Sequence, residues 1–180
     1  MPIVISNSII LKTITIEDYS SLYELMERIY PPAYNYLWSD KGEWYLHEIY
    51  GKKQVAIDLE DKHSSFYFIE VDGQKEGVLK IQEDVPYPDI LEKKATRLHR
   101  IYLSEKTQGK GISRQLLSYV EKRAIENGSD LIWLDCMDSK KQAMRFYEKH
   151  GFQKGRLTFL DYKLIKKGYN GMYFMWKSVV

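Results

Sequence analysis

The strongest constraint on the fold is a glycine-containing turn, residues 108–113, with the sequence Gln-Gly-Lys-Gly-Ile-Ser. The segment before it, Arg97 to Leu103, is rich in residues typical of a β-strand. After the turn, apolar residues recur at helical spacing up to Asn127-Gly128, which predicts a helix over 111–127. A strand that leads through glycines into a long amphipathic helix is typical of an α/β domain.

The turn has the chemistry of a pyrophosphate site. Its glycines allow backbone N–H groups to approach a ligand, and the helix N-terminus adds free N–H groups and partial positive charge. Lys110 adds a further cation. The segment lacks the Gly-Lys-Ser/Thr ending of a Walker loop and the third glycine of the dinucleotide fingerprint. The residues alone therefore leave two interpretations open, a phosphate-binding loop and a tight turn that binds nothing.

The remaining pattern indicates one domain over residues 1–180, without repeats or a flexible linker. Strands are expected over 9–14, 65–71, 77–82, 97–103, 131–137, 155–162 and 171–178, and Asp72-Gly73 is a strong hairpin signal. Helices are expected from Ile16 to Pro31-Pro32, from Asp40, over 111–127 and over 139–150. Because strands and helices alternate in the second half, we expect a mixed sheet with locally parallel strands.

Composition excludes several classes of function. The formal net charge is only +2, whereas proteins that bind nucleic acids usually carry a much larger basic excess. No apolar run is long enough to cross a bilayer, and the first ten residues lack a signal-peptide pattern, so a cytoplasmic protein is expected. The single cysteine, Cys136, lies in an apolar run and is expected in the core. His47, His63 and His150 lack metal-ligand spacing, and no metal is expected.

A second segment, residues 142–152, changes the interpretation of the glycine turn. It reads Gln-Ala-Met-Arg-Phe-Tyr-Glu-Lys-His-Gly-Phe and lies one predicted strand beyond the long helix. Together the two segments resemble the GNAT superfamily of N-acetyltransferases. The pattern of that family is a strand, Gln/Arg-x-x-Gly-x-Gly/Ala, a helix, a strand, and a helix ending in Ala-x-x-Phe-Tyr-x-x-x-Gly-Phe. The chain looks most similar to the spermine/spermidine (PaiA-like) branch.

This resemblance implies an α/β fold with a mostly antiparallel sheet of about seven strands, a central splayed parallel pair and about four flanking helices. It also implies acetyl-CoA as co-substrate. The residues that then match coenzyme contacts are Ile101, Tyr102, Leu103, Gln108, Gly109, Lys110, Gly111, Ile112, Ser113, Lys140 and Phe146. Two of these depart from the family pattern. Ser113 replaces the final Gly/Ala, and Lys140 stands where many relatives carry an Asn, from where it could reach a coenzyme phosphate instead.

The implied chemistry is direct attack of a neutral amine on the acetyl thioester. Tyr147 matches the family's general acid, while a phenylalanine–tyrosine pair on a helix is also typical of a packed core. His99, two residues before Ile101, is a candidate base because an imidazole accepts a proton near neutral pH. The alternatives are a hydrogen-bonded strand histidine and a water relayed from the acidic loop over 83–94.

The acceptor is expected to bind near the first two helices and the acidic loop. Tyr34, Trp38, Glu83 and Asp84 are the candidate contacts, because aromatic faces and carboxylates suit a cationic amine. A polyamine or another small primary amine is therefore expected. The same residues are also compatible with a closed core and a solvated loop. A peptide or protein N-acetyltransferase and a non-catalytic acyl-CoA-binding regulator remain as alternative functions. A homodimer is compatible with the sequence, although no segment requires one.

Overall fold

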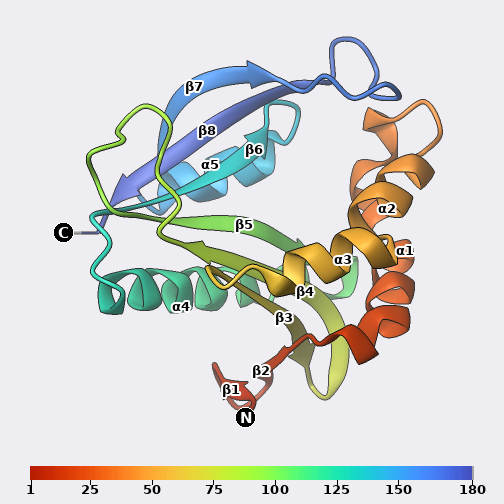
Figure 1. The fold of residues 1–180 in the computed structure, drawn as a ribbon, viewed down its shortest axis with the longest axis horizontal. Coiled ribbons are helices and arrows are strands. Elements are labelled where there is room, and N and C mark those ends of the chain that lie inside the picture. Colours follow the sequence, from red (N-terminus) through yellow and green to blue (C-terminus); the bar gives the residue numbers. More distant parts are fainter. Residues whose placement is uncertain (180) are drawn as a thin grey trace.

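A computed structural model describes residues 1–179, which form one eight-stranded sheet and five α-helices (Figure 1). The strands are β1 Ile3–Val4, β2 Ile9–Thr13, β3 Ser64–Val71, β4 Gln74–Glu83, β5 Ala95–Leu103, β6 Leu131–Met137, β7 Gln153–Phe159 and β8 Gly171–Ser178. The helices are α1 Tyr19–Tyr34, α2 Glu43–Tyr50, α3 Lys52–Glu60, α4 Ile112–Glu126 and α5 Lys141–Lys149. None of these helices has the length and apolar character needed to cross a bilayer.

The sheet has the order β1-β2-β3-β4-β5-β6-β8-β7, and every neighbouring pair is antiparallel except β5 and β6. This arrangement confirms the expected mixed, mostly antiparallel sheet. β5 and β6 can be parallel because α4 connects them as a crossover. Antiparallel strands can be joined by a short hairpin and need no such connection.

The two parallel strands separate partway along their length. Their pairing ends at Leu98 and Leu134, although β5 continues to Leu103 and β6 to Met137. On the other side of β5, Arg100 pairs with Lys80 while Leu98 pairs with Ile81, so His99 is the extra residue of a β-bulge. The far halves of both strands are therefore free of each other, and a space opens between them.

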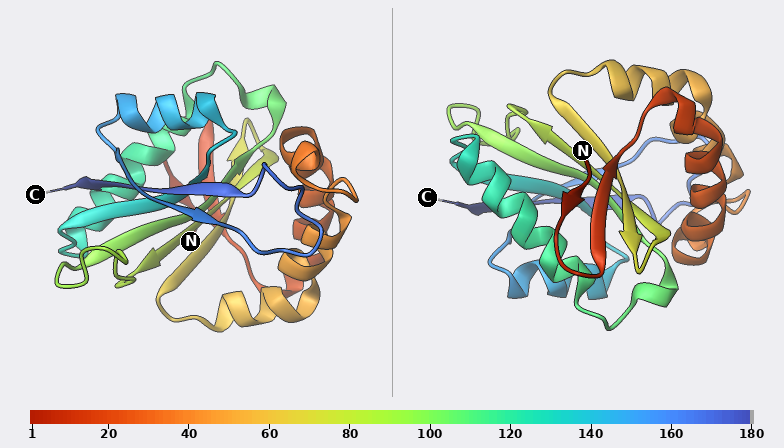
Figure 2. Two further views of the ribbon diagram at one scale, coloured as in Figure 1. Left: turned by 90° about the horizontal axis from the view of Figure 1, so that it is seen from above. Right: turned by 90° about the horizontal axis from the view of Figure 1, so that it is seen from below.

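Each face of the sheet has its own apolar core. The core that contains Leu79, Leu98 and Leu134 is covered by the apolar faces of α4 and α5. The core that contains Phe66, Phe68 and Val78 is covered by α1, α2 and α3. Figures 1 and 2 show these two groups of helices on opposite sides of the sheet. Ligands that approach from the two sides can therefore meet only where β5 and β6 separate.

The expected end of the first helix at Pro31-Pro32 was wrong. Both prolines lie inside α1, which continues to Tyr34. Proline in a helix interior removes a hydrogen bond and strains the preceding turn. Packing compensates here, because the Tyr34 ring stacks on Tyr30 at 5.0 Å and meets the edge of Tyr102 at 5.5 Å.

The sequence prediction also omitted α3 and the two-residue strand β1. Only Val55 and Asp58 of α3 are buried, so its apolar periodicity is too weak to mark a helix. The segment after Asp40 begins its helix at Glu43, because the Asp40 carboxylate accepts hydrogen bonds from the backbone N–H groups of Gly42 and Trp44. The sixth predicted strand, 155–162, is observed as β7 at 153–159.

Candidate active site

A cavity of about 640 Å³ occupies the space between the separated strands and extends to both faces of the sheet. On the α4–α5 side it is lined by β5, the glycine turn and the starts of α4 and α5. On the opposite side it is lined by α1, α2 and the segment that joins β7 to β8. One hollow therefore connects the predicted coenzyme turn with the predicted acceptor region.

The glycine turn is shaped for an anion. Gly109 and Gly111 have φ angles of +74° and +70°, a left-handed conformation that favours glycine. A Cβ atom built at either residue would meet no protein atom within 4 Å, and both residues line the cavity. Ile112, buried at the start of α4, fixes the helix end beside the hollow. The first N–H groups of a helix lack intrahelical partners, so they are available to a phosphate here.

The other predicted coenzyme residues mostly reach the same cavity. Ile101, Tyr102, Leu103, Gln108, Gly109, Gly111, Ile112, Ser113, Lys140 and Phe146 all line it. Lys110 is exposed and is not among the lining residues. The backbone of β5 beyond Leu98 is unpaired on its β6 side, which leaves a strand edge for an extended ligand. The glycine turn could therefore hold a diphosphate, and the free edge of β5 could align an extended arm such as that of acetyl-CoA.

Lys140 does not reach toward the glycine turn, contrary to the expectation that it contacts a coenzyme phosphate. Its Nζ donates a hydrogen bond to the backbone oxygen of Ala33 on α1. The ammonium also lies 4.3 Å from the centre of the Tyr34 ring. Burial lowers the pKa of Lys140. Lys140 therefore contacts α1 rather than the glycine turn.

Tyr147 projects from α5 into the cavity. Its ring packs edge-on against Phe146 at 5.3 Å and Phe152 at 5.5 Å, which fixes its direction. Burial, with a smaller effect of Cys136, raises the pKa of the Tyr147 phenol above its usual value. The hydroxyl is therefore protonated at neutral pH and can donate a proton or a hydrogen bond.

His99 lies in the bulge of β5 and lines the cavity. Burial, followed by the positive charges of Arg100, Arg97 and Lys80, lowers the pKa of His99 to about 2. Within residues 1–179 its Nδ1 atom is buried without a hydrogen-bond partner. An imidazole with this pKa is neutral at pH 7 but is a weak base, so its environment does not favour the predicted role.

Tyr34 and Trp38 line the cavity on the side formed by α1 and α2, where the sequence leads us to expect the acceptor. Trp38 Nε1 donates a hydrogen bond of 2.8 Å to the Tyr30 hydroxyl, and the rings of Tyr30 and Tyr45 stack at 4.5 Å. The Tyr45 and Tyr102 hydroxyls are 3.2 Å apart. These contacts hold a wall of aromatic rings in place beside the space between β5 and β6.

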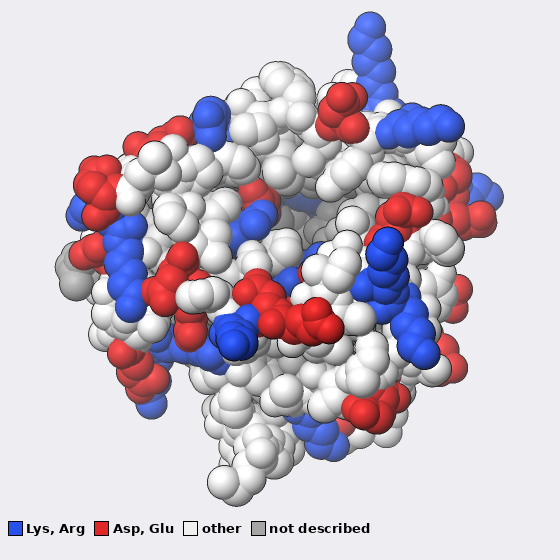
Figure 3. Space-filling view, viewed as in Figure 1, with Lys and Arg blue, Asp and Glu red and all other residues white. Residues whose placement is uncertain are grey.

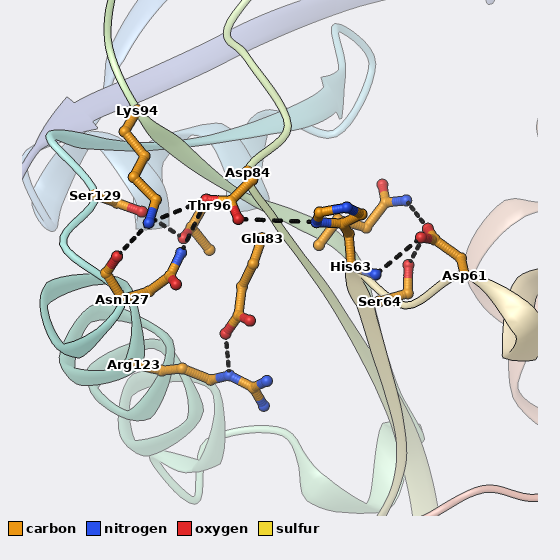
Figure 4. A network of polar contacts seen from close by, with 11 residues as sticks. Asp61, His63, Ser64, Glu83, Asp84, Lys94, Thr96, Arg123, Asn127 and Ser129 are labelled. Atoms are coloured by element: carbon orange, nitrogen blue, oxygen red, sulfur yellow. Dashed lines mark hydrogen bonds and ion pairs between the residues drawn. The ribbon is translucent and has the colours of Figure 1, made fainter.

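Glu83 and Asp84 do not line the cavity, which corrects their assignment as acceptor contacts. Figure 4 shows them in a separate polar network beside α4. The Glu83 carboxylate accepts a hydrogen bond of 2.6 Å from Arg123 Nε, and Asp84 lies 3.2 Å from Lys94 Nζ. Both carboxylates thus join the end of β4 to neighbouring segments, and the acidic loop contributes no side chain to the hollow.

Sequence reasoning missed Arg97, Arg100 and Asp135, all of which line the cavity. Arg97 donates to Asp135 Oδ2 through both Nε and Nη2. In the described chain, Asp135 Oδ1 is buried without a hydrogen-bond partner. The available signal was a single carboxylate within the apolar run 131–137, which is unusual for a buried strand.

Comparison with known protein families assigns this chain to one of them. The pattern of the Acetyltransferase (GNAT) family matches residues 20–152. The chain belongs to this family. The family, its fold and its acetyl-CoA co-substrate are those expected from the two sequence motifs.

Three relatives illustrate the likeness. An uncharacterized N-acetyltransferase in the pepI 3' region of Lactobacillus delbrueckii subsp. lactis is 26% identical over 110 residues, which are 61% of this chain and 64% of that protein. The match thus covers less than two thirds of the relative. Streptothricin acetyltransferase of Escherichia coli is 26% identical over 72% of this chain and 71% of its own length. The crystal structure of the PaiA N-acetyltransferase of Thermoplasma acidophilum in complex with coenzyme A superposes with a TM-score of 0.70 at 21% identity, over 95% of this chain and 99% of that one.

Proposed function

We propose that this protein transfers the acetyl group of acetyl-CoA to the primary amine of a small molecule by direct attack in a ternary complex. The observation that carries the proposal is the single cavity that joins the glycine turn to the aromatic wall through the gap between β5 and β6. Both substrates can occupy such a cavity at the same time, so no acyl-enzyme is needed to carry the group between them.

Acetyl-CoA supplies an activated acyl group in the form of a thioester. The glycine turn and the N-terminus of α4 would hold its diphosphate, and the free edge of β5 at Ile101 to Leu103 would align its pantetheine arm. Tyr147 would donate a proton to the departing thiolate; its protonated phenol and the ring contact that fixes it beside Phe146 support this role.

The acceptor amine must lose a proton before it can attack. The cavity is lined by four cations, Arg97, Arg100, Arg114 and Lys140, and by one acid, Asp135. Burial and neighbouring positive charge both lower the pKa of an amine, and burial lowers the pKa of Lys140 in this cavity. Asp135 lines the cavity, and its Oδ1 atom has no hydrogen-bond partner among residues 1–179, so this oxygen is a candidate contact for the ammonium or for a water that takes its proton.

The expectation of a polyamine acceptor rested on aromatic side chains together with acidic ones. The aromatic side chains Tyr34 and Trp38 support it, and Glu83 and Asp84 do not. A polyamine is therefore retained as one class to test rather than as the proposed acceptor. The name of the Escherichia coli relative, streptothricin acetyltransferase, agrees with a small-molecule amine as acceptor.

The test is thiol release from acetyl-CoA by the purified protein with amino acids, polyamines, amino-sugar antibiotics and peptides as acceptors. Release with small amines supports the proposal, and release only with peptides would establish a peptide N-acetyltransferase instead. Calorimetry with coenzyme A is run in parallel. If the protein binds coenzyme A but releases no thiol from acetyl-CoA with any of these acceptors, it would be a non-catalytic binding protein.

A further inference from the structure

A buried cluster of three charged side chains lies directly behind the acceptor side of the cavity. Asp58 of α3 receives Lys80 Nζ at 3.0 Å on Oδ1 and Arg100 Nη1 at 2.6 Å on Oδ2. The exposed fractions of the three residues are 7%, 1% and 9%. Two cations share one carboxylate, so the cluster carries one excess positive charge.

Neighbouring carboxylates offset this charge only in part, since Asp61 attracts Lys80 from a more exposed position. Arg97 and Asp135 form a pair of their own. Asp61 is the other nearby carboxylate, but it lies on the surface beyond Lys80 and accepts hydrogen bonds from Ser64 and Gln82. A buried charge without a counterion is costly, so a cluster of this composition indicates an anionic partner that the folded chain itself does not supply.

Arg100 is the member of the cluster that reaches the cavity. Among residues 1–179, only its Nη1 has a protein partner for the guanidinium, although this group carries five N–H donors. Its plane is supported by the rings of Tyr50 at 5.3 Å and Phe66 at 5.9 Å. Figure 3 shows basic side-chain atoms, with acidic atoms beside them, at the hollow in the middle of this face.

Resting on the proposed function, we propose that the acceptor carries a carboxylate in addition to its amine, and that Arg100 binds this carboxylate. The guanidinium has a fork geometry that matches a carboxylate, and the Tyr50 and Phe66 rings hold it in one direction. Tyr102, two residues further along β5, lies in the aromatic wall of the acceptor side. The acceptor class is therefore a small amino acid rather than a polyamine.

The test compares each α-amino acid and a set of ω-amino acids with the corresponding carboxamide in the thiol-release assay. For the preferred acceptor, kcat/KM of the carboxylate is expected to exceed that of the carboxamide by at least about tenfold, because charge-assisted bonds to arginine are strong. Arg100→Gln should abolish this preference, and Arg100→Lys should retain part of it. Arg114→Gln, which removes a cavity cation at the coenzyme end, is the matched control and should leave the preference unchanged.

A binding measurement accompanies the assay. With coenzyme A present, the N-acetyl amino acid should raise the melting temperature of the wild type more than its carboxamide does, and Arg100→Gln should remove the difference. Calorimetry with coenzyme A shows whether each variant is folded. Equal rates for carboxylate and carboxamide, or a preference for polyamines, would overturn the inference while leaving acetyl transfer intact. Coenzyme binding without release from any acceptor would overturn the proposed function, and the inference with it.

Discussion

At the scale of single residues, Tyr147 is the clearest test of the chemistry. Tyr147→Phe removes only the hydroxyl and leaves the ring contacts with Phe146 and Phe152. If the phenol donates the proton, kcat should fall by about a hundredfold or more while coenzyme affinity is unchanged. Tyr173→Phe, on β8 outside the cavity, is the control in the same assay. Unchanged turnover in Tyr147→Phe would remove this residue from the mechanism.

His99 gives a prediction about acid stability. Its pKa is about 2 in the folded protein and near 6.5 when exposed, so the unfolded chain binds the proton more readily. The stabilisation from its neutral form is complete above pH 6.5 and is lost as the pH falls toward 2. When the pH is lowered from 7 to 5, the melting temperature of the wild type should therefore fall further than that of His99→Gln. His47→Gln, at an exposed site, should behave like the wild type. Equal losses in all three proteins would contradict the burial of a neutral imidazole.

At the scale of elements, the two ends of α4 form a matched pair. Gly111 precedes the helix and Gly128 follows it, both with φ of +70° and open space where a Cβ would lie. Alanine at either position should cost about 1 kcal/mol of folding stability, because the left-handed conformation is strained with a side chain. Only Gly111→Ala should also weaken coenzyme A binding, by about tenfold or more, because its methyl group enters the predicted phosphate site. Calorimetry and melting curves on both variants separate the effects, and equal coenzyme affinities would exclude the turn as the phosphate site.

Glu83 joins β4 to α4 through Arg123, which also donates to the hydroxyls of Tyr67 and Ser65. Glu83→Gln should therefore reduce folding stability, by about 1 kcal/mol because the pair is partly exposed. It should leave the acceptor KM unchanged, since Glu83 does not line the cavity. Urea unfolding and steady-state kinetics are the measurements. A raised KM without loss of stability would restore the acceptor role assigned from the sequence.

At the scale of the whole molecule, features set by residues close together in the sequence could be predicted, whereas features set by contacts between distant residues could not. The turn at Gly109 to Gly111 and the helix with Tyr147 are local patterns, so their elements and their place in one cavity could be read from the sequence. The residues on the acceptor side of the cavity could not be read from the sequence in this way. Glu83 resembles a substrate contact until its pairing across 40 residues with Arg123 is known, and Arg100 resembles a solvated strand residue until α3 packs over it. The bulge at His99 likewise depends on the register between two strands.

Cys136 offers a measurement of how the whole molecule opens. It is the single cysteine, it is 5% exposed, and burial raises the pKa of its thiol to about 12. A thiol reagent at pH 8 should therefore react with the native protein far more slowly than with the unfolded chain, because the thiolate is the reactive form and the sulfur must first be exposed. Because Cys136 also lines the cavity, coenzyme A at a hundred times its Kd should slow the reaction by about another hundredfold if the reagent reaches the sulfur only when the coenzyme has left. Labelling at the rate of the unfolded chain would contradict the burial of this strand, whereas slow labelling without a coenzyme effect would show that the strand opens with coenzyme still bound.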